Sequence, residues 1–205
     1  MKKLLSQRLP RFDKKIDRLS KLVGQIKQKH SISWGDRLLI ERSVLQLQTE
    51  WELFVREFIL DSATGKFASS QSNFNSVYTV SATLSREKIL NKLSVSANSL
   101  RHREPNWSIT KEAIAASGKL ELSNHNHISA VLGASPWYLD DLRPIRNFVA
   151  HYSKRSALEV RKSFKLSTRD KICPSQLSLQ TVGGGISKFE QWANFIKVTG
   201  KGLVH

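Results

Sequence analysis

The chain has 205 residues, 40% of them hydrophobic, which favours one domain with a single buried core over two full domains. Its 33 Lys and Arg against 17 Asp and Glu give a net charge of +16. Such a balance favours a polyanionic partner, usually nucleic acid or an anionic membrane, although a domain that is simply basic is the alternative. No stretch approaches the roughly 18 consecutive apolar residues that span a bilayer, so we expect no membrane association.

The N-terminal segment begins like a secretion signal, but its apolar run ends at Leu5, so we do not expect export. Cys173 is the single cysteine. It excludes an intramolecular disulfide, favours a reducing, cytoplasmic location, and is interpreted as a packing residue.

Apolar residues at spacings of three and four predict two helices in the first 60 residues. The first covers residues 9 to 26 and has a basic outer face, since residues 1 to 30 contain ten Lys or Arg and two Asp. The second, over residues 36 to 60, is predicted to be a long core helix with Ser33 or Asp36 as its N-cap.

A Ser- and Asn-rich connection follows over residues 62 to 82, in which V-Y-T-V could form a short strand. Three shorter helices are then predicted, over residues 85 to 100, 110 to 118 and 124 to 133, with Gly118 closing the second.

The prolines in the second half of the chain suggest further helix starts. Ser135 and Pro136 predict a short helical turn, and Pro144 predicts the first residue of a helix that runs to about Phe164. Residues 153 to 171 hold seven Lys or Arg and two acids. After the breaker at residues 183 to 185, the spacing predicts a last amphipathic helix through Phe189 and Trp192.

The segment R-P-I-R-N-F-V-A-H-Y, residues 143 to 152, suggests a chemical site. With Pro144 first in the helix, Arg146 falls in the first turn, where free N–H groups and the helix dipole favour a phosphate. His151 can transfer protons near neutral pH. The two suit metal-free RNA cleavage, in which a base deprotonates a 2′-OH, the oxygen attacks the adjacent phosphorus, and a cation stabilises the developing charge.

The spacing of the pair raises a geometric objection. Five positions place two side chains about 140° apart around a helix, so either the long Arg146 side chain reaches around the helix end or a second subunit completes the site. The alternative is that Arg146 and His151 are a surface pair on an ordinary packed helix.

The R-N-F-V-A-H stretch resembles the R-N-x-x-x-H form of the HEPN superfamily signature, and T-E-W-E-L-F-V-R-E, residues 49 to 57, resembles the W-E-x-F run of its RiboL-PSP-HEPN branch. The resemblance covers residues 36 to 165 as the core of one domain spanning residues 1 to 205. It implies an all-α, HEPN-like helical bundle, here with an extra N-terminal helix (1 to 30) and a C-terminal helical extension (166 to 205).

The resemblance further implies a homodimeric, metal-independent endoribonuclease without cofactors. Such proteins are typically the toxin of a toxin–antitoxin or abortive-infection system, held in check by a cognate antitoxin. Arg146 and His151 would be catalytic, and Asn147 would orient the phosphate or the histidine. Some relatives carry H-x-Y, with the tyrosine as a modification site. Tyr152 instead follows His151 directly, which puts that form of neutralisation in doubt.

Four further residues are predicted to bind RNA: Arg143, Lys154, Arg155 and Glu52. Glu50 or Glu52 could lend the cleft a carboxylate, although an ion-paired or solvated helix face is the competing interpretation. A non-catalytic nucleotide- or RNA-binding module, and a basic protein that docks to an acidic partner, are the alternative functions.

Other polar and aromatic residues favour structural roles. His125 and His127 lack further ligands for a metal and are interpreted as part of a polar loop. The R-H-R run at residues 101 to 103 is interpreted as a basic helix end that could contact an RNA backbone. Trp107 and Trp137 could be exposed enough to stack on bases, although tryptophans more often lie in cores or interfaces.

Overall fold

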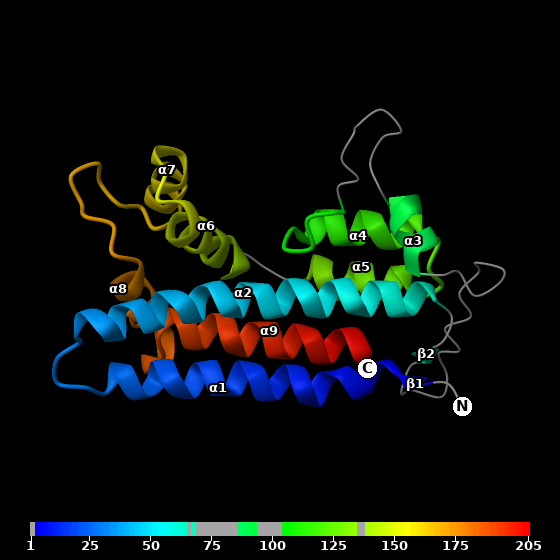
Figure 1. Cartoon of the computed structure of the whole chain (residues 1–205), viewed down its shortest axis with the longest axis horizontal. Helices are drawn as coiled ribbons and strands as arrows, with labels where there is room; N and C mark the ends of the chain where they lie inside the picture. Colours follow the sequence, from blue (N-terminus) through cyan, green and yellow to red (C-terminus); the bar gives the residue numbers. More distant parts are fainter. Residues whose placement is uncertain (1–2, 65–66, 69–85, 94–103, 135–137) are drawn as a thin grey trace. The chain divides into compact units, whose positions relative to one another are not determined.

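The structure is a computed structural model, and it describes residues 3–64, 67–68, 86–93, 104–134 and 138–205. The chain divides into two compact units, each formed from segments that are distant in sequence. Unit 1 comprises Met1–Phe12, Trp51–Ser135 and Val198–His205, and unit 2 comprises Asp13–Glu50 and Pro136–Lys197. Three long helices contribute to both units: α1 (Leu9–Lys27), α2 (Trp34–Ala63) and α9 (Lys188–Val204) (Figure 1).

Helices dominate the described residues. The strands among them are β1 (Lys3–Leu4) and β2 (Phe67–Ala68), which form one short parallel pair. The predicted all-α class is therefore confirmed.

Unit 1 contains the 3-10 helix η1 (Leu5–Arg8) and the helices α3 (Arg86–Leu93), α4 (Thr110–Lys119) and α5 (His125–Gly133). An aromatic cluster lies in its core, where the Phe12 and Phe54 rings stack with centroids 4.3 Å apart. A Cβ at position 200 would lie 3.1 Å from the Phe12 ring, so this close approach of α9 favours Gly200, and a larger residue would require the ring to shift.

Unit 2 contains α6 (Tyr138–His151), α7 (Lys154–Ser163), α8 (Pro174–Leu179) and the 3-10 turn η2 (Gly183–Gly185), together with most of α1 and α9 and the first half of α2. Ion pairs join the long helices within this unit. Lys15 on α1 bonds Glu50 on α2 at 2.6 Å, and Lys197 on α9 bonds Asp17 on α1 at 2.6 Å. The core beneath these pairs is apolar: Ile16, Leu19, Val23, Ile40, Val44, Leu47, Leu142, Ile145, Val160, Phe189, Trp192 and Ile196 are buried.

The periodicity of the apolar residues correctly predicted the long helices. At the start of α2 the two candidate caps act together, because Ser33 Oγ accepts from the Asp36 N–H at 3.1 Å and Asp36 Oδ2 accepts from the Ser33 N–H at 3.0 Å. This reciprocal pair is a capping box with Asp in place of Glu. The predicted start of α5 after Asn124 is also confirmed.

One of the predictions for the shorter helices was wrong, and one short helix was not predicted. Gly118 does not close α4, which continues through Lys119, and the left-handed residue after the helix is Glu121 with φ +52°. The short helix α8 was not predicted, although Pro174 at its first position is a start signal. The predictions for V-Y-T-V, for Ser85 and residues 94 to 100, for the R-H-R run and for Ser135, Pro136 and Trp137 lie outside the described residues.

Pro144 does not open a helix, as the sequence had suggested, but lies in the middle of α6. A proline inside a helix removes one backbone hydrogen bond and costs about 3 kcal/mol. Burial on both sides of the proline offsets this cost, because Leu142 and Ile145 are both 0% exposed and each contributes roughly 1.5–3 kcal/mol. The helix therefore continues through the proline.

The predicted single helix from Pro144 to about Phe164 is also wrong, because the chain breaks between α6 and α7. Tyr152 adopts a left-handed backbone with φ +43°. Ser153 then caps α7, since its Oγ accepts from the Ser156 N–H while Ser156 Oγ accepts from the Ser153 N–H, both at 3.1 Å. This serine capping box starts a new helix and explains the break.

Candidate functional site

The residues of the R-P-I-R-N-F-V-A-H-Y segment lie on α6 and at its C-terminal end, in a helical hairpin formed by α6 and α7. Asp141 on α6 anchors this hairpin. Its carboxylate accepts a hydrogen bond of 2.5 Å from Ser163 Oγ at the end of α7 and pairs with Lys188 on α9. The Lys188 ammonium also lies 4.9 Å from the centroid of the Phe164 ring. One carboxylate thus connects three elements of unit 2.

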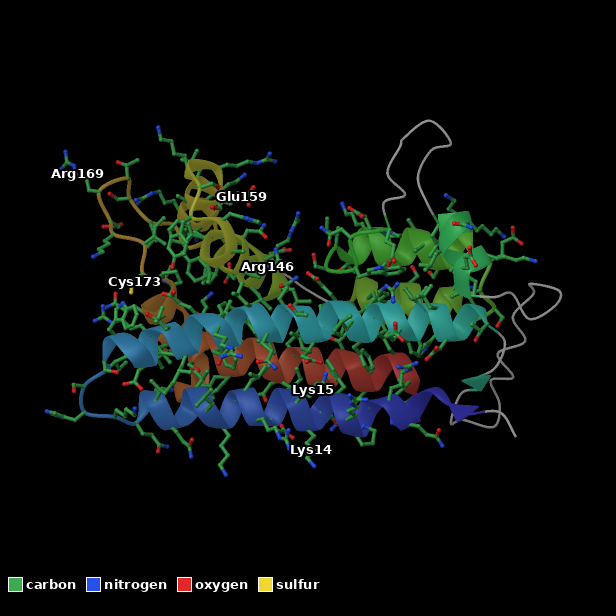
Figure 2. The ribbon with its side chains drawn as sticks, viewed as in Figure 1. Lys14, Lys15, Arg146, Glu159, Arg169 and Cys173 are labelled. Carbon is green, nitrogen blue, oxygen red and sulfur yellow. The ribbon has the colours of Figure 1, made fainter. Side chains whose placement is uncertain are left out.

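Arg146 is half-buried on α6, between Pro144 and the helix end (Figure 2). Because α6 begins at Tyr138, the free N–H groups of the helix start are two turns away from Arg146. The predicted phosphate site at the helix N-terminus is therefore wrong.

The Arg146 guanidinium has a partly satisfied environment. Its Nη1 donates to Asn147 Oδ1 at 3.2 Å, whereas its buried Nε has no hydrogen-bond partner among the described residues. A buried donor without an acceptor costs about 1–3 kcal/mol. An added anionic acceptor would recover part of that energy.

His151 is the last residue of α6, and its side chain is exposed. In the described part of the chain it makes no hydrogen bond or ion pair with another residue, Arg146 included. The continuous helix keeps the two side chains about 140° apart. The structure therefore agrees with the geometric objection and does not bring the predicted pair together within one chain.

Lys154 and Arg155 occupy the first turn of α7, three and four residues after His151, and both are exposed. The Arg155 side chain is 92% exposed and lies 3.6 Å from Glu159. Cations at the positive end of a helix dipole are electrostatically unfavourable in the free protein. An anion bound there would reduce this repulsion.

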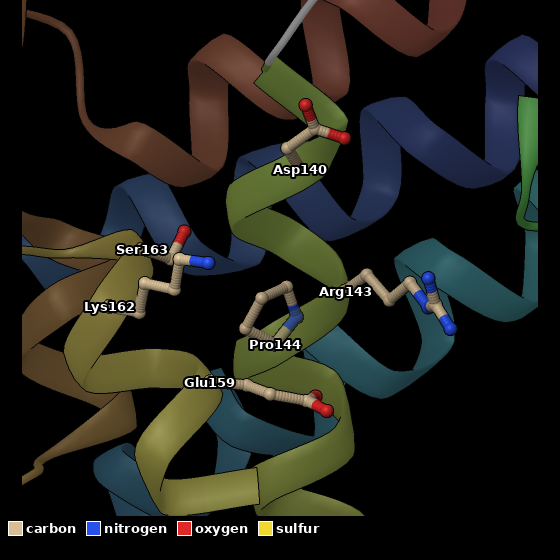
Figure 3. Close-up of a pocket in the computed structure, with 6 residues that line it drawn as sticks. All are labelled: Asp140, Arg143, Pro144, Glu159, Lys162 and Ser163. Atoms are coloured by element: carbon tan, nitrogen blue, oxygen red, sulfur yellow. The ribbon is translucent and has the colours of Figure 1, made fainter.

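Arg143 lines a cavity of about 520 Å³ between α6 and α7, together with Asp140, Pro144, Glu159, Lys162 and Ser163 (Figure 3). The lining carries two carboxylates and two cations. Because these charges balance, the cavity is poorly suited to a phosphate, and the predicted RNA contact of Arg143 gains no support from it.

Glu50 and Glu52, the two glutamates of α2 that the sequence had suggested for the cleft, gain no support from the structure. Glu50 forms its ion pair with Lys15, which confirms the interpretation of an ion-paired helix face. Glu52 is half-buried and belongs to unit 1, whereas the other six predicted site residues belong to unit 2.

Two exposed aromatic residues of unit 2 were not predicted as site residues, although Tyr152 was noted for its place directly after His151. Tyr152 is 62% exposed, and its hydroxyl donates to Glu41 Oε2 at 3.0 Å. Partial burial, followed by the bond to the Glu41 carboxylate, raises the pKa of Tyr152 above its usual value. Trp34, in the first turn of α2, is 76% exposed. Its position about 120° from the buried stripe of α2 is a signal that could have identified it.

The remaining candidates have structural surroundings. His125 and His127 lie in the first turn of α5 rather than in a loop, where their ring nitrogens bond Ser117 Oγ and the Gly202 carbonyl, both at 2.8 Å. Trp107 is buried and donates to Glu104, so it offers no stacking face. In the described segments no three His, Cys, Asp or Glu side chains gather as a metal site would require.

No helix in the described part of the chain combines the length and hydropathy that crossing a membrane requires. Comparison of the chain with protein-family models, with curated proteins and with solved structures gives no match.

Proposed function

We propose that the chain is a metal-independent endoribonuclease of HEPN type, the toxin of a toxin–antitoxin or phage-defence system. The observation that supports this most is the corner between α6 and α7. There an exposed His151 is followed within four residues by two exposed cations, Lys154 and Arg155. A phosphodiester at this corner would meet a proton-transfer group and the positive charge that holds its backbone.

In the proposed reaction His151 removes the proton from a ribose 2′-OH. The O2′–P bond forms and the P–O5′ bond breaks, which leaves a 2′,3′-cyclic phosphate on one fragment. The O5′ leaving group takes a proton from a general acid and becomes a hydroxyl. A guanidinium stabilises the charge on the phosphoryl oxygens. We assign this role to Arg146, because its Nη1 is bonded to Asn147 and its Nε donor has no hydrogen-bond partner among the described residues.

A second copy of the chain is part of the proposal. Within one chain Arg146 and His151 project in different directions from α6, and one exposed histidine cannot serve as base and acid at the same moment. A homodimer would bring two such corners to one cleft and supply both. A cognate antitoxin that covers this corner would block cleavage.

Cleavage of RNA in the presence of EDTA tests the chemistry. The purified full chain is incubated with total RNA, and wild type is compared with His151→Ala, with Arg146→Lys and with His30→Ala as the matched control, because His30 is an exposed histidine of the same unit. We expect His151→Ala to lower the cleavage rate at least 100-fold, the usual contribution of a general acid or base. Arg146→Lys should lose a substantial part of the rate, and the control should lose none.

The products provide a second readout, because the mechanism requires fragments that end in a cyclic phosphate and begin with a 5′-hydroxyl. Cleavage that needs added metal, or that survives His151→Ala, would refute this mechanism.

One observation favours a second function, that of a non-catalytic RNA- or nucleotide-binding module. Arg146 donates a hydrogen bond to Asn147 and forms no hydrogen bond with His151 in the described chain. A module that only binds would retain the exposed cations of α7 without needing the pair to meet. Tight RNA binding without turnover, in both wild type and His151→Ala, would identify this function.

A further inference from the structure

A surface of unit 2 combines exposed aromatic rings with exposed cations. On α2, Trp34 is 76% exposed and Leu38 is 44% exposed. They lie four residues apart on the helix, about 120° and 160° from its buried stripe, and Glu41 continues the same face one turn later. We call Trp34, Leu38 and Tyr152, with the cations Arg37, Arg42, Lys154 and Arg155, the aromatic–basic surface.

Tyr152 reaches this face of α2 through the 3.0 Å hydrogen bond from its hydroxyl to Glu41. Glu41 lies seven residues after Trp34, so the two anchor points are about 10 Å apart along one side of the helix. The hydrogen bond to Glu41 thus joins Tyr152, from the end of α6, to the side of α2 that carries Trp34.

The Tyr152 ring is held in place before any ligand binds. Its backbone is fixed in the left-handed conformation at the end of α6, its hydroxyl is bonded to Glu41, and its ring contacts Phe148 with centroids 5.0 Å apart. The side chain nevertheless remains 62% exposed. A ring that is fixed but open costs little conformational entropy when a flat ligand stacks on it.

The charges around these rings select the kind of ligand. Arg37, Arg42, Lys154 and Arg155 are exposed, while the two nearby carboxylates are engaged, Glu41 with Tyr152 and Glu159 with Arg155. Apolar faces beside positive charge fit a ligand that alternates planar rings with phosphates. That pattern is typical of proteins that bind single-stranded nucleic acid.

We infer that the aromatic–basic surface binds unpaired RNA by stacking bases on Trp34 and Tyr152 while its cations hold the phosphates. The inference rests on the proposed function in taking RNA as the ligand, and it adds a base-binding surface beside His151. A duplex keeps its bases stacked on one another, so its bases cannot occupy these rings.

The test measures binding of the full chain to a dye-labelled, twelve-nucleotide oligouridylate by fluorescence anisotropy. The RNA is 2′-O-methylated, so it cannot be cleaved by 2′-OH attack and binding is read independently of catalysis. The same oligonucleotide in duplex form and a backbone of equal length with abasic sites serve as comparison ligands.

We expect Trp34→Ala and Tyr152→Ala each to weaken binding of the oligouridylate about tenfold, the effect of losing one base–aromatic stack. Their affinity for the abasic backbone should stay at the wild-type value, because the phosphate contacts remain. Trp34→Phe should bind the oligouridylate with an affinity within about threefold of wild type. It should lack the decrease in Trp34 fluorescence that stacking of a base would cause. Val198→Ala, which shortens an exposed side chain of unit 1, is the control and should match wild type.

Three results would overturn the inference. Affinity of Trp34→Ala and Tyr152→Ala equal to wild type would show that bases do not stack there. An equal loss of affinity for the oligouridylate and for the abasic backbone would show that the variants affect phosphate binding alone. Conversion of a dimer to a monomer by Trp34→Ala in sedimentation, with RNA affinity unchanged, would show that the surface joins two copies. If the variants lose RNA affinity as expected but the wild-type chain does not cleave RNA in EDTA, only the proposed catalysis is overturned.

Discussion

Replacing Asp141 by alanine tests the anchor of the α6–α7 hairpin. The Asp141 and Lys188 side chains are only 15% and 16% exposed, and Asp141 also accepts the Ser163 hydroxyl. Removing one partner of a fully buried pair costs about 3–5 kcal/mol. Because this pair retains some contact with water, we expect Asp141→Ala to lower the free energy of unfolding by about 2–3 kcal/mol.

For a chain of this length that loss corresponds to a decrease of roughly 5–10 °C in Tm, measured by calorimetry and by urea unfolding. Asp17→Ala is the matched control, because it removes an ion pair of the same unit whose carboxylate side chain is 60% exposed. It should cost less than about 1 kcal/mol. Adding Lys188→Met to Asp141→Ala should restore part of the stability by removing the unpaired cation. A cost for Asp141→Ala no greater than that of Asp17→Ala would refute this account.

Three further predictions concern helix ends, glycines and pH. Ser153→Ala removes the cap of α7 and should cost about 1 kcal/mol in urea unfolding; an unchanged midpoint would contradict it. Gly24 and Gly184 both have open space for a Cβ, but only Gly184 has a positive φ, +79°, so Gly24→Ala should stabilise by about 1 kcal/mol and Gly184→Ala should destabilise. The hydrogen bond from Lys29, assisted by Ser33, lowers the pKa of Asp36 from 3.8 to about 2. Its stabilising contribution is present above pH 4 and is lost as the pH falls toward 2. The free energy of unfolding of Asp36→Asn should therefore change less between pH 4 and pH 2 than that of wild type. Parallel pH dependences of wild type and variant would show that ionisation of Asp36 contributes nothing.

How much of the fold the sequence predicts depends on where packing agrees with local preference. The spacing of apolar residues correctly predicts α1, α2 and α9, because each long helix buries one stripe. It fails at Pro144, where burial of Leu142 and Ile145 outweighs the proline's preference for a helix start. The S-x-x-S box at residues 153 to 156 was present in the sequence and would have predicted the start of α7.

The candidate site was predictable in part for the same reasons. The separation of Arg146 and His151 follows from helix geometry alone, and in the structure the two side chains form no hydrogen bond with each other. The location of Arg146 at the start of a helix depended on Pro144 and was wrong. Trp34 and Tyr152 were not predicted to bind RNA, because the significance of an exposed aromatic side chain depends on its neighbours. The hydrogen bond between Tyr152 and Glu41 joins residues 111 positions apart.

The way both units draw on α9 constrains how the protein is made. Phe189 and Trp192 are fully buried in unit 2, and Leu203 and Val204 are buried in unit 1. A ribosome must therefore translate through α9 before either hydrophobic interior can close. A polypeptide that stops before residue 188 would lack part of the core of both units. Neither unit would then fold on its own, and both would be exposed to proteases and chaperones.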